Sequence, residues 1–186
     1  EPTANILNYT SPGYKAFPVE YDLQEAKRLA HEVLGNKRCE ITYCINGNEP
    51  LQKGEAELIA YWLQDIGLDV KIQAIEYATL SKMMRKGDFN IVRIQKGLAN
   101  GDPFSALYTF IMPDGALNVS NSSGYNNPEV TELMNKVKHI TDEAERQRVF
   151  DRVQEIVVYE QPVIPLFNDM NIVAYNKRLK NYKPLI

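Results

Sequence analysis

Three strand-like segments alternate with two helix-like segments between residues 40 and 94, and the connections between them are short. Residues typical of strands cover Glu40–Ile45, Leu68–Ile75 and Phe89–Ile94. Apolar residues at helical spacing cover Gly54–Ile66 and Thr79–Arg85. Strands joined through a helix run parallel and cross over with a right hand. The pattern alone therefore predicts an α/β fold with a mainly parallel sheet flanked by helices.

The third predicted strand leads into a polar loop rich in glycine and asparagine. This loop reads KGLANGDP from Lys96 to Pro103. Open parallel sheets bind ligands beyond the carboxyl ends of their strands, where such loops lie. The preceding strand, Leu68–Ile75, alternates between apolar and polar residues, which indicates one solvated face. We therefore expect a ligand site to involve the stretch from Leu68 to Asp102.

A helix is expected before this unit. Asp22 is a suitable N-cap, Glu25 follows three residues later, and Gly35 suits the carboxyl end. The spacing of its apolar residues places them on one helical stripe, made of Ala26, Leu29, Ala30, Val33 and Leu34. The next predicted helix has its own stripe, made of Leu58, Ile59, Trp62, Leu63 and Ile66.

The pattern changes after Pro103. A helix is predicted over Phe104–Ile111 with Asp102 as its cap, and residues 112–126 are predicted to be a polar loop. Two further helices, opening at Asn127-Pro128 and at Asp142, are joined closely enough to form an antiparallel pair. Two extended segments then follow, at Pro162–Phe167 and Asn171–Tyr175.

Composition excludes several classes of function. The 186 residues carry a net charge of −3 without a cluster of lysine and arginine, so we expect no nucleic-acid partner. Cys39 and Cys44 leave opposite faces of the predicted first strand, which argues against a disulfide, and no CxxC pattern or nearby histidine indicates a metal. GxSxG, HExxH and P-loop patterns are also absent, so the chain is predicted not to be an enzyme and to need no cofactor.

Several stretches together resemble one known family. They are YDLQEAKRLAHEVLG, EAELIAYWLQDIGLDVKIQAIEYATLSKMMRKGDFNIVRI, and GYNNPEVTELMN continuing through the helix pair to NYKP. Their order and spacing resemble the extracytoplasmic solute-binding proteins of the peptide/nickel class, family 5, which serve ABC importers. The resemblance covers roughly residues 20–184, and it implies the C-terminal lobe of a type II periplasmic-binding-protein fold.

The resemblance also implies a domain plan and partners. Residues 1–21 are expected to be an extended connecting segment, residues 22–176 a single α/β ligand-binding lobe, and residues 177–186 a segment returning towards an N-terminal lobe missing from this chain. The opening Glu1-Pro2-Thr3 suggests a chain cut from a longer protein. The implied partners are a peptide or small-molecule ligand, that N-terminal lobe and ABC permease subunits. The implied location is periplasmic or at the cell surface, with a lipoprotein anchor possible.

Peptide-binding members of this family carry a W-x-A-D-Y-x-[DE]-P stretch, whose Asp holds the α-amino group of the ligand. The run from Lys96 to Pro103 keeps the Asp-Pro end but has Lys96 at the Trp position and Ala99 at the Asp position. The departure favours a ligand with an acidic group over the usual recognition of a peptide N-terminus. The candidate ligand-binding residues are Arg93, Lys96, Gly97, Leu98, Ala99, Asn100, Asn118, Ser120 and Tyr125.

Alternatives stay open at this point. Lys96 at the surface, the glycines as turn residues and residues 118–126 as a plain surface loop would leave the site elsewhere. An oligopeptide is the default ligand by resemblance. A nickel chelate or another small anion is the alternative within the same class, and a stand-alone sensor or interaction module is the alternative outside it.

Overall fold

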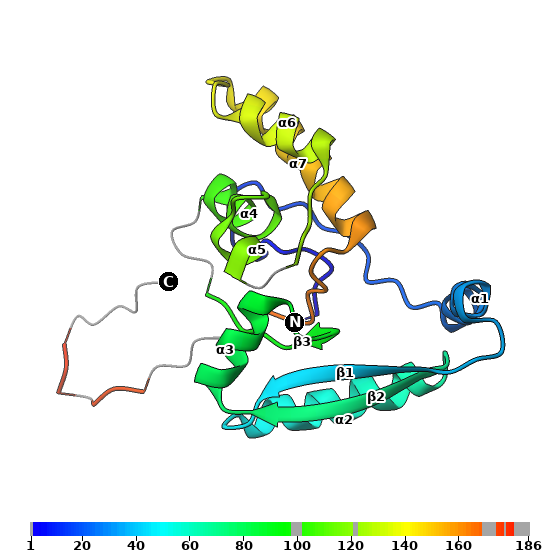
Figure 1. Cartoon of the computed structure of the whole chain (residues 1–186). Helices are drawn as coiled ribbons and strands as arrows, with labels where there is room; N and C mark the ends of the chain where they lie inside the picture. The colour runs from blue at the N-terminus through cyan, green and yellow to red at the C-terminus, as the bar shows by residue number, and fades with distance from the viewer. Residues whose placement is uncertain (1, 98–101, 121–122, 169–173, 177, 181–186) are drawn as a thin grey trace.

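The computed structural model describes residues 2–97, 102–120, 123–168, 174–176 and 178–180. A small sheet with its helices forms one part, and a group of helices packed on the amino-terminal segment forms the other (Figure 1). The elements in chain order are α1 (Leu23–Leu34), β1 (Cys39–Asn46), α2 (Pro50–Gln64), β2 (Leu68–Ile75), α3 (Tyr77–Lys86), β3 (Ile91–Val92), α4 (Pro103–Ile111), α5 (Ala116–Ser120), α6 (Pro128–Val137) and α7 (Glu143–Glu160).

The described sheet has the order β2-β1-β3, and both strand pairs are parallel. This confirms the predicted α/β class and the bounds of Leu68–Ile75. The third strand is shorter than predicted, because only Ile91 and Val92 join the ladder. The side-chain oxygen of Asn90 accepts the amide of Thr42 at 2.9 Å and so takes the place of a backbone partner. Pairing therefore begins at Ile91, two residues after the predicted start at Phe89.

Helix α2 begins four residues earlier than predicted. Pro50 occupies its first turn, where a missing backbone N–H costs nothing. The predicted core stripe is wrong in part: Leu58 and Trp62 are about half exposed, whereas Ala56 and Ala60 are buried. Small residues let the helix lie close to the sheet, so the face that carries them packs inward.

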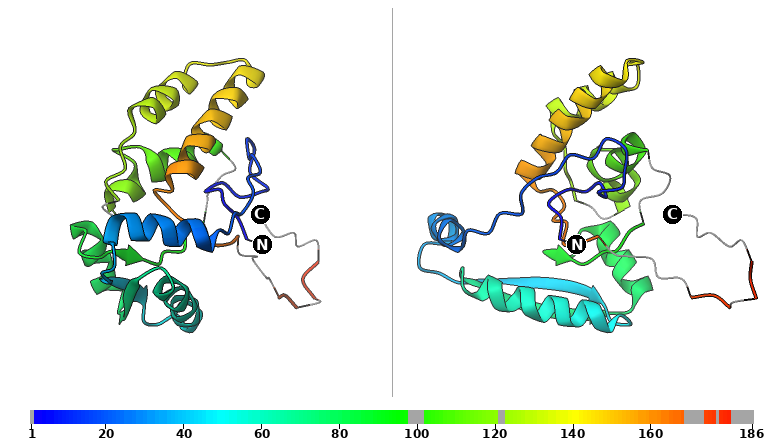
Figure 2. Two further views of the ribbon diagram at one scale, coloured as in Figure 1. Left: turned by 90° about the vertical axis from the view of Figure 1, so that its right-hand side faces the viewer. Right: turned by 180° about the vertical axis from the view of Figure 1, so that it is seen from behind.

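Helix α1 has the predicted N-cap, since Asp22 accepts the amide of Glu25 at 2.9 Å. Its predicted apolar stripe is covered only in part, since Ala26, Ala30 and Leu34 are half-buried. Leu29 is 48% exposed and Val33 is 84% exposed, and no residue of the helix is buried. The helix lies beside the amino-terminal end of β1, away from the helices that follow the sheet (Figure 2).

The main hydrophobic core lies among the helices after the sheet. The helix pair α6–α7 buries the predicted residues Val130, Met134, Val153 and Val157, which confirms both helical stripes. The amino-terminal segment has no helix among residues 2–21, yet Leu7 is fully buried in this core. The proposed boundary between a connecting segment and a lobe stays a prediction.

A buried amide network holds that segment on α7. Gln154 accepts the Nδ2 of Asn5 at 2.7 Å and the backbone amide of Lys15 at 3.1 Å, and it donates to the carbonyl of Gly13 at 2.9 Å. Asn5 and Gln154 are both buried. Because buried amides without partners are costly, this network fixes where the segment runs.

Residues 112–126 were predicted to be a polar loop, and this is wrong for Ala116–Ser120, which forms α5. Asn118 is buried and donates to the carbonyls of Met112 and Tyr125 at 2.9 and 2.8 Å. Further along, Phe167 makes an isolated antiparallel bridge with Pro2, within the first predicted extended segment. Most of the second, Asn171–Tyr175, lies outside the described residues.

Candidate functional site at the carboxyl ends of the parallel strands

A cavity of about 400 Å³ lies beyond the carboxyl ends of β1 and β3. Helix α3 forms one wall, the turn into α2 another, and the chain after β3 a third. Open parallel sheets place ligand sites at this edge. The described residues that line the cavity are Asn46, Glu49, Gln52, Tyr77, Leu80, Ser81, Met84, Arg93, Ile94, Gln95, Lys96 and Leu117.

The register of the sheet explains why residues far apart in sequence meet here. Cys44 of β1 pairs with Val92 of β3, and the amide of Arg93 donates to the carbonyl of Cys44 at 2.9 Å. The two strands thus leave the sheet side by side. The turn after Asn46 and the segment up to Lys96 then face the same cavity.

The floor of the cavity and one polar residue of its wall are buried in the fold. Leu80 and Met84 of α3 are buried below it. Gln52 is also buried, and its side-chain oxygen accepts the amide of Asn46 at 3.1 Å. This bond ties the end of β1 to the first turn of α2 and fixes the rim that carries Glu49.

Arg93 was predicted to bind ligand, and it does line the cavity. Its charge is already engaged, since its Nε lies 2.7 Å from the Oε2 of Glu55, and the two side chains are only 12% and 14% exposed. It also donates to the carbonyl of Ile94 and lies over the ring of Phe167 at 5.5 Å. Arg93 therefore holds the cavity wall together instead of offering a free positive charge.

Lys96 and Glu49 are the other charged residues among the described lining. Both are exposed, and the described structure contains no hydrogen bond or ion pair to either side chain. Glu49 holds the N-cap position of α2 but makes no capping bond. Each therefore offers an unpaired charge at the rim of the cavity.

The other predicted site residues have different outcomes. Gly97 is exposed next to Lys96, while Leu98, Ala99 and Asn100 lie outside the described residues. Asn118 is committed to the backbone of its own loop, so it supports structure away from the cavity. Ser120 ends α5, and its side chain is not described.

Tyr125 is likewise engaged elsewhere. Its hydroxyl donates to Glu160 at 2.6 Å, and its ring packs against the helical core. Burial and this hydrogen bond raise the pKa of Tyr125 above its ordinary value, so its hydroxyl stays protonated and available to Glu160. Neither it nor Asn118 is among the described residues lining the cavity.

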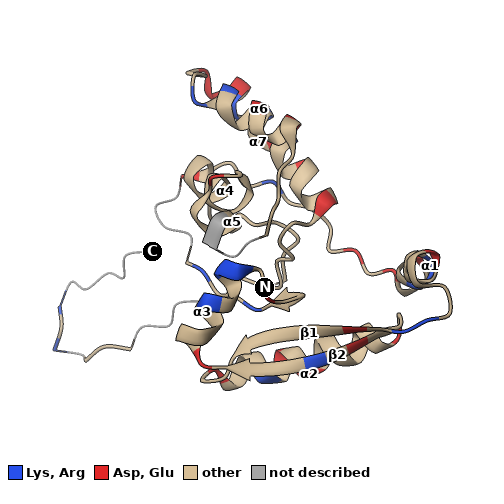
Figure 3. Ribbon diagram, in the orientation of Figure 1, with Lys and Arg blue, Asp and Glu red and all other residues tan. Residues whose placement is uncertain are grey.

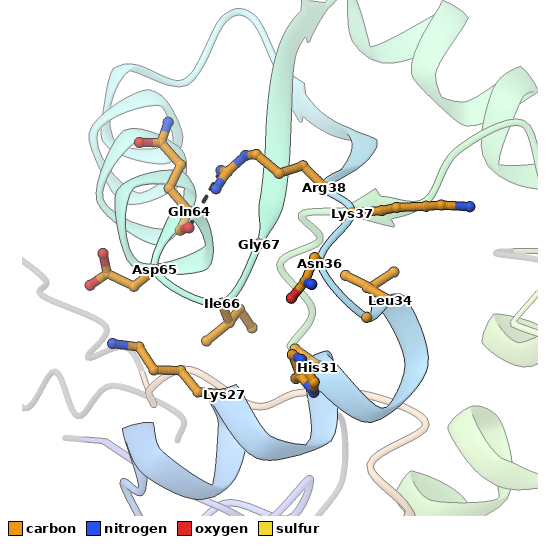
Figure 4. Close-up of a pocket in the computed structure, with 12 residues that line it drawn as sticks. Lys27, His31, Leu34, Asn36, Lys37, Arg38, Gln64, Asp65, Ile66 and Gly67 are labelled. Atoms are coloured by element: carbon orange, nitrogen blue, oxygen red, sulfur yellow. Dashed lines mark hydrogen bonds between the residues drawn. The ribbon is translucent and has the colours of Figure 1, made fainter.

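A smaller hollow of about 270 Å³ lies at the opposite end of the sheet, between the carboxyl ends of α1 and α2 (Figure 4). Arg38 on its wall donates to the carbonyl of Gln64 at 3.4 Å and pairs with Asp69 at 2.7 Å. The amino-terminal edge of a parallel sheet is not where ligands usually bind, so this hollow is the weaker candidate.

Charges elsewhere are mixed along the helices (Figure 3). Several form exposed pairs of opposite sign, such as Arg28 with Glu25 and Glu32. Among the residues described, no group of three or more His, Cys, Asp or Glu side chains is placed to hold a metal ion. Over the same residues, no helix combines the length and apolar character that crossing a membrane requires.

Comparison with known proteins identifies relatives of this architecture. The family model of bacterial extracellular solute-binding proteins, family 5 middle, matches residues 1–118. The probable D,D-dipeptide-binding periplasmic protein DdpA of Escherichia coli K12 is 26% identical over 171 residues. That match covers 91% of this chain and 33% of the relative, so the chain spans about a third of the length of the relatives it matches.

Solved structures agree with this result. The periplasmic binding protein DppA of Helicobacter pylori, solved with the peptide STSA, matches with a TM-score of 0.79 and 29% identity over 89% of this chain and 33% of its own. NikA of Brucella suis, solved with Fe(III)-EDTA, matches with a TM-score of 0.72 and 21% identity over 89% of this chain and 36% of its own, which supports the fold alone. The chain belongs to the bacterial extracellular solute-binding proteins of family 5.

Proposed function

We propose that this chain forms one wall of the ligand-binding cleft in the substrate-binding component of an ABC importer, and that the cleft takes an oligopeptide or a related small solute. The observation that carries the proposal is the cavity beyond β1 and β3, which has an apolar floor and unpaired charges at its rim. Around that floor most of the described lining is polar or charged, so the cavity can fix the orientation of a ligand that carries polar groups. The peptide-related names of DdpA and DppA support the ligand class.

In this proposal, the second wall comes from an N-terminal lobe. The apolar residues left exposed on α1 and α2, such as Val33, Leu51 and Leu58, support an incomplete surface over a closed, stand-alone module. The complete receptor works outside the cytoplasm, in the periplasm or at the cell surface with or without a lipid anchor, and delivers its ligand to permease subunits.

A binding role fits the cavity better than catalysis. Ser81 is a hydroxyl-bearing residue of the described lining, and no histidine lines the cavity beside it as a base. A receptor for a nickel chelate or another small anion is the second candidate, because Lys96 offers a free positive charge at the rim. The two candidates predict different preferences for ligands without a positive charge.

The test is to fill the cavity. Ser81→Trp places a large ring into it, whereas Lys82→Trp on the same helix adds the same ring outside the described lining. The complete receptor is titrated with trialanine and with citrate in a calorimeter. Ser81→Trp should abolish the binding that is measured, and Lys82→Trp should preserve it. Equal loss in both variants, or binding that survives Ser81→Trp, would remove the cavity from the site. Citrate binding without trialanine binding would favour the second candidate.

The chain alone should bind the same ligand more weakly than the complete receptor, because one wall of the cleft is missing. A thermal melt of the 186-residue chain reports this directly. Stabilisation of the isolated chain by several kcal/mol at saturating ligand would contradict the two-walled site.

A further inference from the structure

Glu49 stands out among the N-cap residues of the described helices. At five other helices the capping side chain accepts a backbone amide of the first turn, namely Asp22, Glu76, Asp102, Asn127 and Asp142. The side chain of Glu49 accepts none, although it holds the same position before Pro50. Its carboxylate is therefore not used by the fold, and it lies on the wall of the cavity.

Lys96 carries the opposite charge and lies on the chain that follows the neighbouring strand, β3. Cys44 of β1 and Val92 of β3 are paired in the sheet. Glu49 follows β1 and Lys96 follows β3 by similar numbers of residues, so both come after strand ends that lie next to each other. Both residues line one cavity of about 400 Å³. No salt bridge between them is formed among the described contacts, so each keeps its charge available to a ligand.

The remaining charge at the cavity is internally balanced. Arg93 is neutralised by Glu55 at 2.7 Å, in a pair that is mostly buried. The free charges on the described lining are then one carboxylate and one ammonium group. A purely anionic ligand meets repulsion from Glu49, and a purely cationic ligand meets repulsion from Lys96. A ligand that carries one charge of each sign satisfies both.

The sequence gives a second reason to expect the carboxylate that binds a ligand ammonium group at the start of α2. Residues 94–101, which follow β3, read IQKGLANG and contain no acidic residue. Within this chain, a carboxylate for a ligand ammonium group therefore has to come from another part of the cavity wall. Glu49 is the acidic residue that the described lining supplies.

We propose that Glu49 binds the ammonium group of a zwitterionic ligand and that Lys96 binds its carboxylate. The inference rests on the proposed function, because it assigns ligand groups to the same cavity. It fixes the orientation of a small peptide, with its amino end at the turn into α2 and its carboxyl end at the chain after β3. It also makes Glu49 the residue that discriminates between peptides with a free amino group and N-blocked peptides.

Three probes and three variants test this orientation in the complete receptor. The probes are Ala-Ala, N-acetyl-Ala-Ala and Ala-Ala amide, which carry both charges, the carboxylate alone and the ammonium group alone. Glu49→Gln should weaken Ala-Ala and Ala-Ala amide by about 10- to 100-fold, the loss expected for one hydrogen bond between charged groups, and should leave N-acetyl-Ala-Ala unchanged. Lys96→Gln should show the mirror pattern, weakening the two probes that carry a carboxylate.

Glu57→Gln is the matched control. Glu57 lies on the same helix, pairs with Lys53 and does not line the cavity, so all three affinities should stay unchanged. Equal losses for all three probes in Glu49→Gln, or no loss for Ala-Ala, would overturn the assignment while leaving peptide binding intact. A wild-type receptor that binds none of the three probes would instead contradict the proposed function, and this inference with it.

Discussion

Arg93 illustrates how a charged residue can line the cavity while its charge is already paired within the fold. Its guanidinium lies between the carboxylate of Glu55 and the ring of Phe167. Glu55 belongs to α2, and Phe167 pairs with Pro2 of the amino-terminal segment. The Arg93 side chain thus connects the sheet to α2 directly and to the amino-terminal segment through Phe167. The Oε1 atom of Glu55 is buried without a hydrogen-bond partner, so the pair depends on Oε2.

We expect the loss of either partner to destabilise the fold strongly. Arg93→Leu or Glu55→Leu alone leaves a mostly buried charge unpaired and should lower the free energy of unfolding by about 3–5 kcal/mol. The double variant should lose much less than the sum of the two, because no charge is left behind. Urea denaturation of the four proteins measures this coupling. An additive cycle would mean that the pair is not coupled in solution.

Glu57→Gln is again a useful reference. The pair of Glu57 with Lys53 is exposed and its atoms are 3.9 Å apart, so its loss should change the free energy of unfolding by less than about 1 kcal/mol. A large effect there would point to a general loss of helix α2 instead of a specific role for the buried pair.

At the level of the elements, the sequence predicts best where the signal is local. Asp22 and Asp102 were recognised as caps from a few neighbouring residues, and both accept first-turn amides. The helix starts predicted near Asn127 and Asp142 are also confirmed, and these two side chains cap their helices. The early start of α2 was missed because Glu49 is a poor cap by residue type. Helix α5 was missed because five residues are too few for a helical periodicity to show and it lies in a stretch rich in Asn, Ser and Gly. Its buried Asn118 is held by the carbonyls of Met112 and Tyr125.

Burial of the helical faces was harder to predict than their existence. Helix α2 carries apolar residues on two sides, and periodicity does not say which side meets the sheet. Leu58 and Trp62 were assigned to the core, yet Ala56 and Ala60 fill it. The stripe of α1 is clear in the sequence, but the described structure covers it only in part, with Ala26, Ala30 and Leu34 half-buried and Leu29 and Val33 exposed. Periodicity marks an apolar face but does not say how much of it the fold covers.

The candidate site likewise contains residues that the sequence predicts and a residue that it does not. Arg93 and Lys96 were found because the ends of parallel strands are expected to bind ligands, and both line the cavity. Glu49 was missed because its place depends on the strand order β2-β1-β3, which brings the ends of β1 and β3 together. Asn118 and Tyr125 were selected for their polarity, but their hydrogen bonds serve the fold.

Two glycines allow a matched test of the elements that hold the cavity. A Cβ at Gly115 would lie 2.7 Å from the carbonyl oxygen of Thr109, so Gly115→Ala should displace the start of α5 and lower the free energy of unfolding by about 1–3 kcal/mol. Gly54 lies inside α2 with open space around its Cβ position, so Gly54→Ala should raise it by about 0.5–1 kcal/mol. Urea melts measure both. Equal effects of the same sign would contradict this placement of α5.

Over the whole molecule, the hydrophobic core is divided unequally. The larger cluster joins α4, α6, α7 and the amino-terminal segment. The smaller cluster, centred on Tyr43, Ile45 and Ala56, joins the sheet to α2. The cavity is lined by Ile94 and Leu117, which pack against the larger cluster, and by Asn46, which directly follows Ile45 of the smaller one. Any relative movement of the two parts therefore changes the shape of the site.

This division predicts two levels of stability in the isolated chain. The amides of α6 and α7 should exchange with solvent only through the largest opening, whereas those of β2 and α1 should exchange through a smaller one, because they are backed by little buried apolar surface. Met134→Ala removes a fully buried side chain from the larger cluster. It should lower the free energy of the opening that allows amide exchange in α6 and α7 by about 2–5 kcal/mol. Ile45→Val, in the smaller cluster, should lower protection in the sheet by about 0.5–1.5 kcal/mol and leave α6 and α7 unchanged. Hydrogen exchange measured by NMR resolves the two sets of amides. If both variants lowered protection equally in the sheet and in the helix pair, the chain would unfold as one unit, and the cavity would not lie between two separately stable parts.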